Sequence, residues 1–220
     1  MDVVVGMCTD EYVTAETVVS LGRTWTADPD FKSRLLMMKG GCADLADTRN
    51  KLVRLFLGSK VEWLLSVDTD IVWEPEDWFR LRDSALNHPA LFVSGTYMVA
   101  KKQPEPCGVV IKDGRFYSLK PDDDTVEMYP VSACGAGFTL IHRDVFLKSA
   151  DMENDHEWYE HGRRGPAGQT LPEDYAFCSR VGEAGIPIFL NTKVRVGHVK
   201  SRVVGWDDYV EGLEKEKNDG

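Results

Sequence analysis

The chain has 220 residues, of which 43% are hydrophobic, and its formal net charge is −10. This length and hydrophobic fraction allow one sizeable core, so we expect a single domain over residues 1–220. The acidic balance disfavours broad binding to nucleic acids or anionic membranes, and five scattered cysteines without a CxxC pair disfavour a disulfide framework or a structural zinc site. No apolar run approaches the ~18 residues of a spanning helix, and no basic signal-peptide region precedes the first apolar stretch. We therefore expect a cytoplasmic protein without stable membrane insertion.

Strands and helices alternate over the first 95 residues. Val18, Leu21 and Trp25 are spaced to face the core from one predicted helix, and Leu55 and Phe56 from the next. The alternation predicts a parallel sheet with helices on both faces. Short apolar runs predict strands at 3–7, 35–38, 61–67 and 91–94, and the apolar spacing predicts helices at 13–25, 44–57 and 75–86.

The second half of the chain has shorter and more irregular elements. Lys112-Asp113-Gly114-Arg115 is a strong turn signal, which predicts a β-hairpin within 109–119. An apolar stretch at 131–142 is punctuated by Gly135 and Gly137. We also expect helices at 143–150, 173–185 and from 207, strands at 186–190 and 194–197, an acidic turn at 122–124 and a mobile polar loop at 151–170.

The most informative stretch is Asp68-Thr69-Asp70, which follows the predicted strand at 61–67. The carboxyl end of such a strand faces the crevice in which open α/β sheets bind ligands. Two neighbouring carboxylates are unfavourable unless a cation lies between them, and hard divalent ions bind carboxylate oxygens and bridge to phosphate. The stretch therefore indicates a metal–diphosphate site. The same pattern would arise if one Asp capped the helix at 75–86 and the other were solvated.

The motifs around this stretch resemble the GT-A glycosyltransferases. Ala46-Asp47-Thr48-Arg49-Asn50, followed by Trp63 to Asp70, is closest to the large inverting family that includes many bacterial and viral sugar transferases. Two further segments match in order, 134–141 (CGAGFTLI) and 172–178 (PEDYAFC). The resemblance covers residues 3–200 and rests on the order and spacing of several motifs. It implies an α/β GT-A fold, Rossmann-like, with a mostly parallel central sheet, helices on both faces and a smaller antiparallel region on the acceptor side.

The resemblance also implies which residues bind the donor. Residues 1–100 would bind a nucleotide-diphosphate sugar, and residues 101–220 would form the acceptor side. Asp68 would contact the ribose or share the metal, and Asp70 would be the firmer metal ligand. Thr9, Arg49 and Asn50 would contact the nucleotide. Metal and cationic side chains at this position stabilise a leaving diphosphate.

The resemblance implies that the acidic pair Glu173-Asp174 lies at the start of an acceptor-side helix. Asp174 would deprotonate the acceptor hydroxyl, which is a weak nucleophile without a positioned base, and Glu173 would support it. Ordinary acidic residues that favour the first turn of a helix would give the same pattern. Gly135 and Gly137 would let an acceptor approach the backbone, and the loop at 163–165 would gate the acceptor.

Four residues near the C-terminus complete the implied donor site. His198 occupies the position of a third metal ligand, and an imidazole suits Mn²⁺ better than Mg²⁺. A structural role for a single histidine is the alternative. Lys200 and Arg202 are close enough in sequence to reach the diphosphate. Trp206 would close over the donor or stack on a sugar ring, or it would simply pack.

The sequence departs from the family pattern after the second strand. The family often has an acidic residue there that recognises the base, whereas this chain has Lys39-Gly40-Gly41-Cys42. The nucleotide, uridine or guanosine, is therefore open, and we favour a UDP-sugar over a GDP-sugar, with Mn²⁺ or Mg²⁺ as the metal. Inversion rests only on the position of Asp174. A protein, a glycan, a small molecule or a modified nucleobase could each be the acceptor, and the oligomeric state is open.

Three other functions compete with a transferase. A haloacid-dehalogenase-type phosphatase would use Asp68 as nucleophile and Asp70 as acid/base, but its motif belongs on the first strand, and no later Lys and paired Asp complete that site. A nucleotidyltransferase would have a glycine-rich basic loop after the first strand, which Cys8-Thr9-Asp10-Glu11 is not. The presence of Asp68, Asp70, Asp174 and His198 together argues against a catalytically inactive nucleotide-sugar-binding protein.

Overall fold

The computed structural model describes residues 1–9, 12–28, 31, 34–40, 45–88, 90–99, 104–121, 125–150 and 157–200. The predicted acidic turn at 122–124, part of the predicted loop at 151–170, and Arg202, Trp206 and the predicted helix from 207 lie outside these ranges. Within the described residues, no helix is both long and apolar enough to cross a bilayer.

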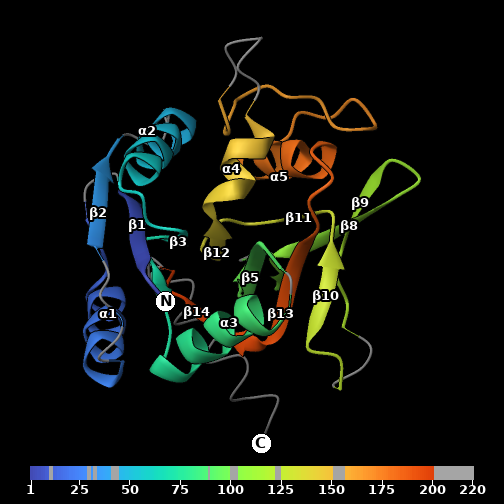
Figure 1. The fold of residues 1–220 in the computed structure, drawn as a ribbon. Helices are drawn as coiled ribbons and strands as arrows, with labels where there is room; N and C mark the ends of the chain where they lie inside the picture. Colours follow the sequence, from blue (N-terminus) through green and yellow to red (C-terminus); the bar gives the residue numbers. More distant parts are fainter. Residues whose placement is uncertain are drawn as a thin grey trace, which may run out of the picture.

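A seven-stranded sheet forms the centre of the molecule, with the strand order β10-β13-β5-β12-β3-β1-β2 (Figure 1). Five strands run in one direction, and β12 and β10 run in the other. This mixed α/β arrangement confirms the predicted class with a mostly parallel sheet. The strands are β1 (Val3–Thr9), β2 (Arg34–Lys39), β3 (Trp63–Val67), β5 (Phe92–Thr96), β10 (Met128–Val131), β12 (Phe138–His142) and β13 (Ile188–Arg195).

Helices cover both faces of this sheet, and successive strand residues alternate between two apolar cores. On β1, Val3 and Val5 pack with Leu65 in one core, whereas Val4 and Leu64 pack in the other. The strands are therefore apolar runs and not alternating patterns, as expected for a sheet buried on both sides. In Figure 1, α1 (Ala15–Ala27) and α3 (Pro75–Asn87) lie on one side of the sheet, and α2 (Leu45–Gly58), α4 (Arg143–Ser149) and α5 (Glu173–Glu183) lie on the other.

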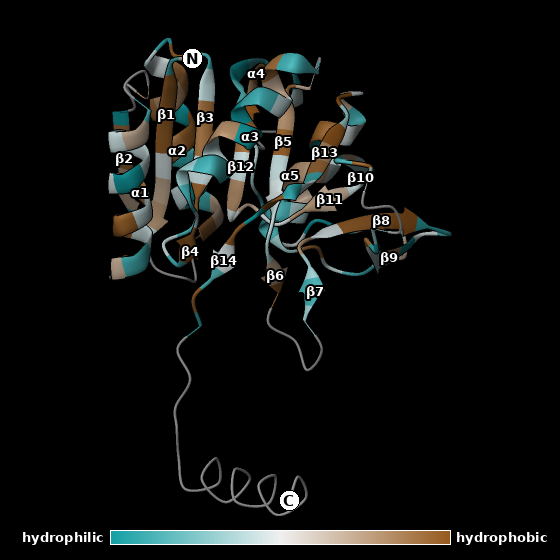
Figure 2. Cartoon of the chain, turned by 90° about the horizontal axis from the view of Figure 1, so that it is seen from below, coloured by the Kyte–Doolittle hydropathy of each residue, from teal (hydrophilic) through white to brown (hydrophobic). Residues whose placement is uncertain are grey.

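Short strands extend the fold beyond the central sheet. Two pairs of them, β4 with β14 and β6 with β7, continue from the carboxyl edge of the central sheet (Figure 2). The predicted hairpin is confirmed: at its turn Asp113 has φ 49° and Gly114 has φ 74°, the left-handed pair that matches the twist of a two-residue hairpin. The short strands are β4 (Ile71–Val72), β6 (Met98–Val99), β7 (Glu105–Pro106), β8 (Gly108–Lys112), β9 (Arg115–Ser118), β11 (Ala133–Cys134) and β14 (Gly197–His198).

Helix α1 buries only part of the face that its apolar spacing predicts. Leu21 is buried as predicted, but Val18 is 56% exposed and Trp25 is 43% exposed, and Thr17 and Ser20 are buried instead. The reason lies in the surface that α1 covers, the irregular backbone after β3. The Thr17 hydroxyl donates to the Ile71 carbonyl at 2.7 Å, and the Ser20 hydroxyl accepts from the backbone N–H of residue 73 at 3.0 Å. Hydroxyls on this face satisfy backbone groups that an apolar face would leave without partners.

Two smaller expectations were also wrong. On α2, Phe56 is fully buried but Leu55 is 51% exposed, because the buried face includes polar residues that serve the site described below. The two strands predicted at 186–190 and 194–197 are largely one strand, β13, with an irregularity after Asn191. The Asn191 carboxamide oxygen accepts from the N–H groups of Lys193 and Val194 at 2.7 and 3.1 Å, so the backbone stays hydrogen-bonded through the irregularity.

Candidate active site

The segment 68–70 is held at the carboxyl edge of the sheet from both sides. The Asp68 N–H donates to the Gly137 carbonyl at 2.9 Å, and the Thr69 carbonyl accepts from the Thr14 N–H at 2.9 Å. Neither Asp68 nor Asp70 caps the helix that follows, since Glu74 is the N-cap of α3. The alternative in which one of these carboxylates is a helix cap is therefore wrong.

Asp70 meets two of the predicted site residues from the other end of the chain. Strand β14 pairs with β4, which sets His198 opposite Ile71. The Asp70 carboxylate oxygen Oδ2 lies 3.2 Å from Nε2 of His198 and 2.8 Å from Nζ of Lys200. Backbone pairing of Val199 with the Asp70 carbonyl at 2.8 Å fixes the arrangement. The structure thus joins three residues that the sequence assigned to one site.

The chemistry of this group suits a divalent cation. Nδ1 of His198 lies 3.2 Å from the Met98 carbonyl and Nε2 lies 3.2 Å from the Asp70 carboxylate, so both ring nitrogens face groups that can only accept. With a cation between Nε2 and Asp70, a neutral ring would donate from Nδ1 to the Met98 carbonyl and bind the ion through Nε2, an arrangement typical of metal sites. Within the described residues, no three His, Cys, Asp or Glu side chains form a complete metal site. An ion here would need further oxygens, such as those of a diphosphate.

Arg49 is buried between the carboxylates of Asp68 and Glu173. Its Nη2 lies 3.0 Å from Asp68 Oδ1, its Nε lies 3.5 Å from Glu173 Oε1, and its guanidinium carbon lies 5.7 Å from the centre of the Tyr159 ring. Burial alone lowers the pKa of Arg49, but the charge of Asp68 and further neighbours raise it above its usual value. Arg49, which is only 5% exposed, is therefore a fixed internal cation. A contact of Asp68 with the metal remains a prediction.

The predicted base lies in the first turn of α5. Asp174 accepts from the Tyr175 N–H at 2.8 Å. Burial raises the pKa of Asp174 from 3.8 to about 7, and the neighbouring charge of Glu173 adds to the rise, while Arg49 opposes it. A carboxylate with a pKa near neutrality is matched to proton transfer at physiological pH. The two acidic residues thus differ in environment, because Glu173 faces Arg49.

Tyr97 is a site residue that the sequence analysis missed. It follows β5 directly and is 6% exposed. Its hydroxyl accepts from the Gly137 N–H at 3.3 Å, and its ring lies edge-on to His198 with 5.2 Å between the ring centres. Burial raises the pKa of Tyr97 well above its usual value, so the phenol stays protonated. The available signal was its position at the end of a strand, on the same edge as Asp68.

The two glycines of the 134–141 motif make room for Tyr97. A Cβ on Gly135 would lie 2.0 Å from the Tyr97 hydroxyl, and a Cβ on Gly137 would lie 2.9 Å from its ring. The sequence predicted that an acceptor approaches the backbone at these glycines. The structure corrects this: the close neighbour of both is a side chain of the protein itself.

Other predicted residues have partners within the protein. The Asn50 amide exchanges hydrogen bonds of 2.8 and 2.9 Å with the Tyr159 backbone, which leaves it a structural role on α2. Thr9 donates its hydroxyl to the Tyr12 carbonyl at 3.1 Å. In the loop at 157–172, Arg163 pairs with Glu160 and Glu183, and Arg164 bonds to groups within the loop. Arg202 and Trp206 lie outside the described residues.

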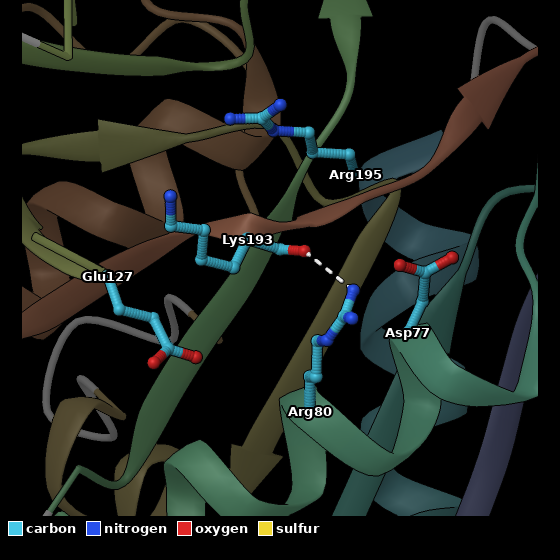
Figure 3. Close-up of a pocket in the computed structure, with 5 residues that line it drawn as sticks. All are labelled: Asp77, Arg80, Glu127, Lys193 and Arg195. Atoms are coloured by element: carbon cyan, nitrogen blue, oxygen red, sulfur yellow. Dashed lines mark hydrogen bonds between the residues drawn. The ribbon is translucent and has the colours of Figure 1, made fainter. Parts of the chain in front are cut away.

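A separate cavity of about 600 Å³ lies between α3 and β13 (Figure 3). Its charges are mixed, and the Arg80 guanidinium bonds to the Lys193 carbonyl at 3.4 Å. None of the carboxylates of the candidate site lines it, so we do not assign it to that site. Its lining residues are Asp77, Arg80, Glu127, Lys193 and Arg195.

Comparison with known proteins identifies the fold. No protein-family model matches the chain, and no curated protein matches its sequence. The structure is similar to A197 from STIV, with 19% identity and a TM-score of 0.58 over 91% of this chain and 87% of that chain. It is also similar to GalNAc-T7, solved with UDP, GalNAc and Mn²⁺, with 12% identity and a TM-score of 0.58 over 93% of this chain and 44% of that chain. These similarities confirm the predicted GT-A fold.

Proposed function

We propose that the chain is a metal-dependent glycosyltransferase that moves a sugar from a nucleotide-diphosphate sugar to an acceptor hydroxyl. The observation that carries this proposal is the grouping of Asp70, His198 and Lys200 at the carboxyl edge of the sheet. Arg49 pairs with both Asp68 and Glu173, which connects the 68–70 segment to the start of α5, where Asp174 lies. GalNAc-T7, which shares the fold, was solved with UDP, GalNAc and Mn²⁺, and this supports the same kind of donor here.

On the donor side, Asp70 and His198 would hold the metal, with Mn²⁺ favoured by the imidazole. A divalent ion bound there would neutralise the charge that develops on a leaving diphosphate. Lys200, whose ammonium lies 2.8 Å from Asp70, adds a second positive charge on the same side. Arg49 orients Asp68, whose side chain remains 32% exposed and can accept from a ribose hydroxyl. We favour a UDP-sugar over a GDP-sugar.

On the acceptor side, Asp174 is the general base. It removes the proton of the acceptor hydroxyl as that oxygen bonds to the anomeric carbon and the bond from this carbon to the diphosphate breaks. Because its pKa is about 7, Asp174 is ionised in a large share of molecules at neutral pH. The proposal of a single displacement with inversion rests on the position of Asp174 as the one base. The acceptor class is left to a screen of glycans, proteins, small molecules and modified nucleobases.

The position of Asp68 in the fold argues against the phosphatase alternative. Asp68 follows β3, the third strand in the chain. The GT-A fold further weakens that alternative, since its motif belongs on the first strand.

Calorimetry with nucleotide sugars tests the proposal. We expect the wild type to bind a UDP-sugar more tightly with Mn²⁺ than with EDTA, and we expect Asp70→Ala to lose the metal-dependent part. Asp83→Ala, an exposed aspartate on α3, is the matched control and should bind like the wild type. Binding that is absent for every nucleotide sugar, or that survives unchanged in Asp70→Ala, would contradict the proposed donor site.

A further inference from the structure

Tyr97 lies where the donor-side and acceptor-side groups approach each other. The chain passes from β5 through Tyr97 to Met98, and the Tyr97 carbonyl accepts from the Cys107 N–H at 3.0 Å. The ring is almost entirely buried at an edge of the sheet that otherwise presents charged and polar groups. Gly135 and Gly137 have no Cβ that would collide with it. Such close packing gives the ring a single orientation.

The Tyr97 hydroxyl is connected to the metal-binding segment through one residue. It accepts from the Gly137 N–H at 3.3 Å, and the Gly137 carbonyl accepts from the Asp68 N–H at 2.9 Å. The same hydroxyl is close to the base. A Cβ on Gly135 would lie 2.0 Å from the hydroxyl and 3.6 Å from Asp174 Oδ2, so the two oxygens are no farther apart than the sum of these distances.

The same short segment orients His198 at two points. The edge-on contact of the Tyr97 ring, with an interplanar angle of 79°, limits how the imidazole can turn. The Met98 carbonyl, one residue further on, lies 3.2 Å from Nδ1. Together these contacts direct Nε2 towards Asp70, 3.2 Å away. A ring held by these contacts would lose less rotational freedom when it binds a metal.

We infer that Tyr97 is a positioning residue: its ring holds His198 towards Asp70, and its hydroxyl holds the 135–137 segment against Asp68, so that the site for a metal-bound diphosphate is preformed. This inference rests on the proposed function, because it gives His198 and Asp70 the role of metal ligands. The ring and the hydroxyl have separate roles. The ring acts on the metal through His198, and the hydroxyl acts on the Gly137 backbone that binds the Asp68 N–H.

Binding of Mn²⁺ in the presence of UDP, followed by electron paramagnetic resonance of the free ion, tests both statements without an activity assay. Tyr97→Phe keeps the ring, and we expect it to weaken Mn²⁺ binding roughly 3- to 10-fold, the effect of one lost hydrogen bond. Tyr97→Leu removes the ring contact, and we expect a loss of about 10- to 100-fold, as for other residues that orient a metal ligand. Tyr117→Leu on the exposed hairpin is the matched control and should bind like the wild type.

A double-mutant cycle separates positioning from general stability. In a His198→Ala background, Tyr97→Leu should have little further effect on Mn²⁺ binding, because the residue it acts through is gone. Equal effects in both backgrounds would overturn the inference, and so would wild-type Mn²⁺ binding by a folded Tyr97→Leu. If that variant does not fold, Tyr97→Phe decides, and binding equal to wild type overturns the inference. If the wild type itself binds no Mn²⁺ with UDP, the proposed function fails and this inference fails with it.

Discussion

Replacement of Arg49 by Met should destabilise the protein in a pH-dependent way. Arg49 is 5% exposed and faces Asp68 at 3.0 Å and Glu173 at 3.5 Å. Methionine keeps the apolar stem but leaves both carboxylates without their buried cation. Removing one partner of a buried ion pair costs about 3–5 kcal/mol. Because the Asp68 side chain is 32% exposed, water screens part of this, and we expect a loss of about 2–3 kcal/mol at pH 7.

The pH dependence follows from Asp174, whose pKa Arg49 lowers. A carboxyl group with a raised folded-state pKa contributes stability that is fully present below its unfolded pKa and is lost as pH rises through the folded pKa. In the wild type this loss occurs between about 4 and about 7. Without Arg49 the folded pKa of Asp174 rises further. The variant should therefore continue to lose stability above pH 7, where the wild type no longer does.

Urea unfolding at pH 5, 7 and 8.5 measures this directly. Arg54→Met is the matched control, because Arg54 lies on the same helix with its side chain 44% exposed and should contribute less than about 1 kcal/mol. A loss below about 1 kcal/mol for Arg49→Met at pH 7, or a loss that does not grow between pH 7 and 8.5, would refute the reasoning. Either result would mean that Arg49 is not the buried counter-charge of Asp68 and Glu173.

Three further predictions follow from single contacts. Asp174→Asn should reduce turnover by about 10²-fold or more. It should also remove the loss of unfolding free energy between pH 4 and 7, which is at most about 4 kcal/mol in the wild type. A wild-type kcat/KM that does not rise through about pH 7 would contradict the assignment of Asp174 as the base. Gly135→Ala should destabilise the protein by about 1–3 kcal/mol in urea unfolding, because its Cβ would lie 2.0 Å from the Tyr97 hydroxyl oxygen. The control is Gly182→Ala on α5, whose Cβ would meet nothing within 4 Å and which should be neutral or stabilising. Equal effects of the two substitutions would show that the close approach of Gly135 to Tyr97 is unimportant. Thr17→Val should lose about 1–3 kcal/mol, because the Ile71 carbonyl loses its 2.7 Å donor, and a thermal unfolding midpoint equal to wild type would exclude that role.

The parts of the fold that the sequence predicts well are those governed by local patterns. The apolar runs of β1 and β3 and the Asp113-Gly114 turn determine their own conformations, so the strands and the hairpin are found where expected. Asp70 and His198 are far apart in the chain, and only the family resemblance implied that they lie together. Local patterns alone contain no information about such a contact.

The parts that the sequence did not predict depend on what each element packs against. The core-facing side of α1 is lined by Thr17 and Ser20 because it covers irregular backbone, and apolar periodicity is insensitive to that. Tyr97 lies in a segment without any motif. Only the tertiary structure shows that a Cβ on Gly135 or Gly137 would collide with the Tyr97 side chain. Arg49 likewise contacts residues far from it in the chain, Tyr159 and Glu173, and no sequence spacing encodes those contacts.

The most direct test of a glycosyltransferase function is UDP release from a panel of UDP-sugars, measured by chromatography with an acceptor mixture and Mn²⁺. We expect the wild type to release UDP from at least one donor, EDTA to stop the release, and Asp70→Asn and Asp174→Asn each to reduce it by about 100-fold or more. Release that is absent for every nucleotide sugar, or that is the same in the wild type and both variants, would contradict the proposed function.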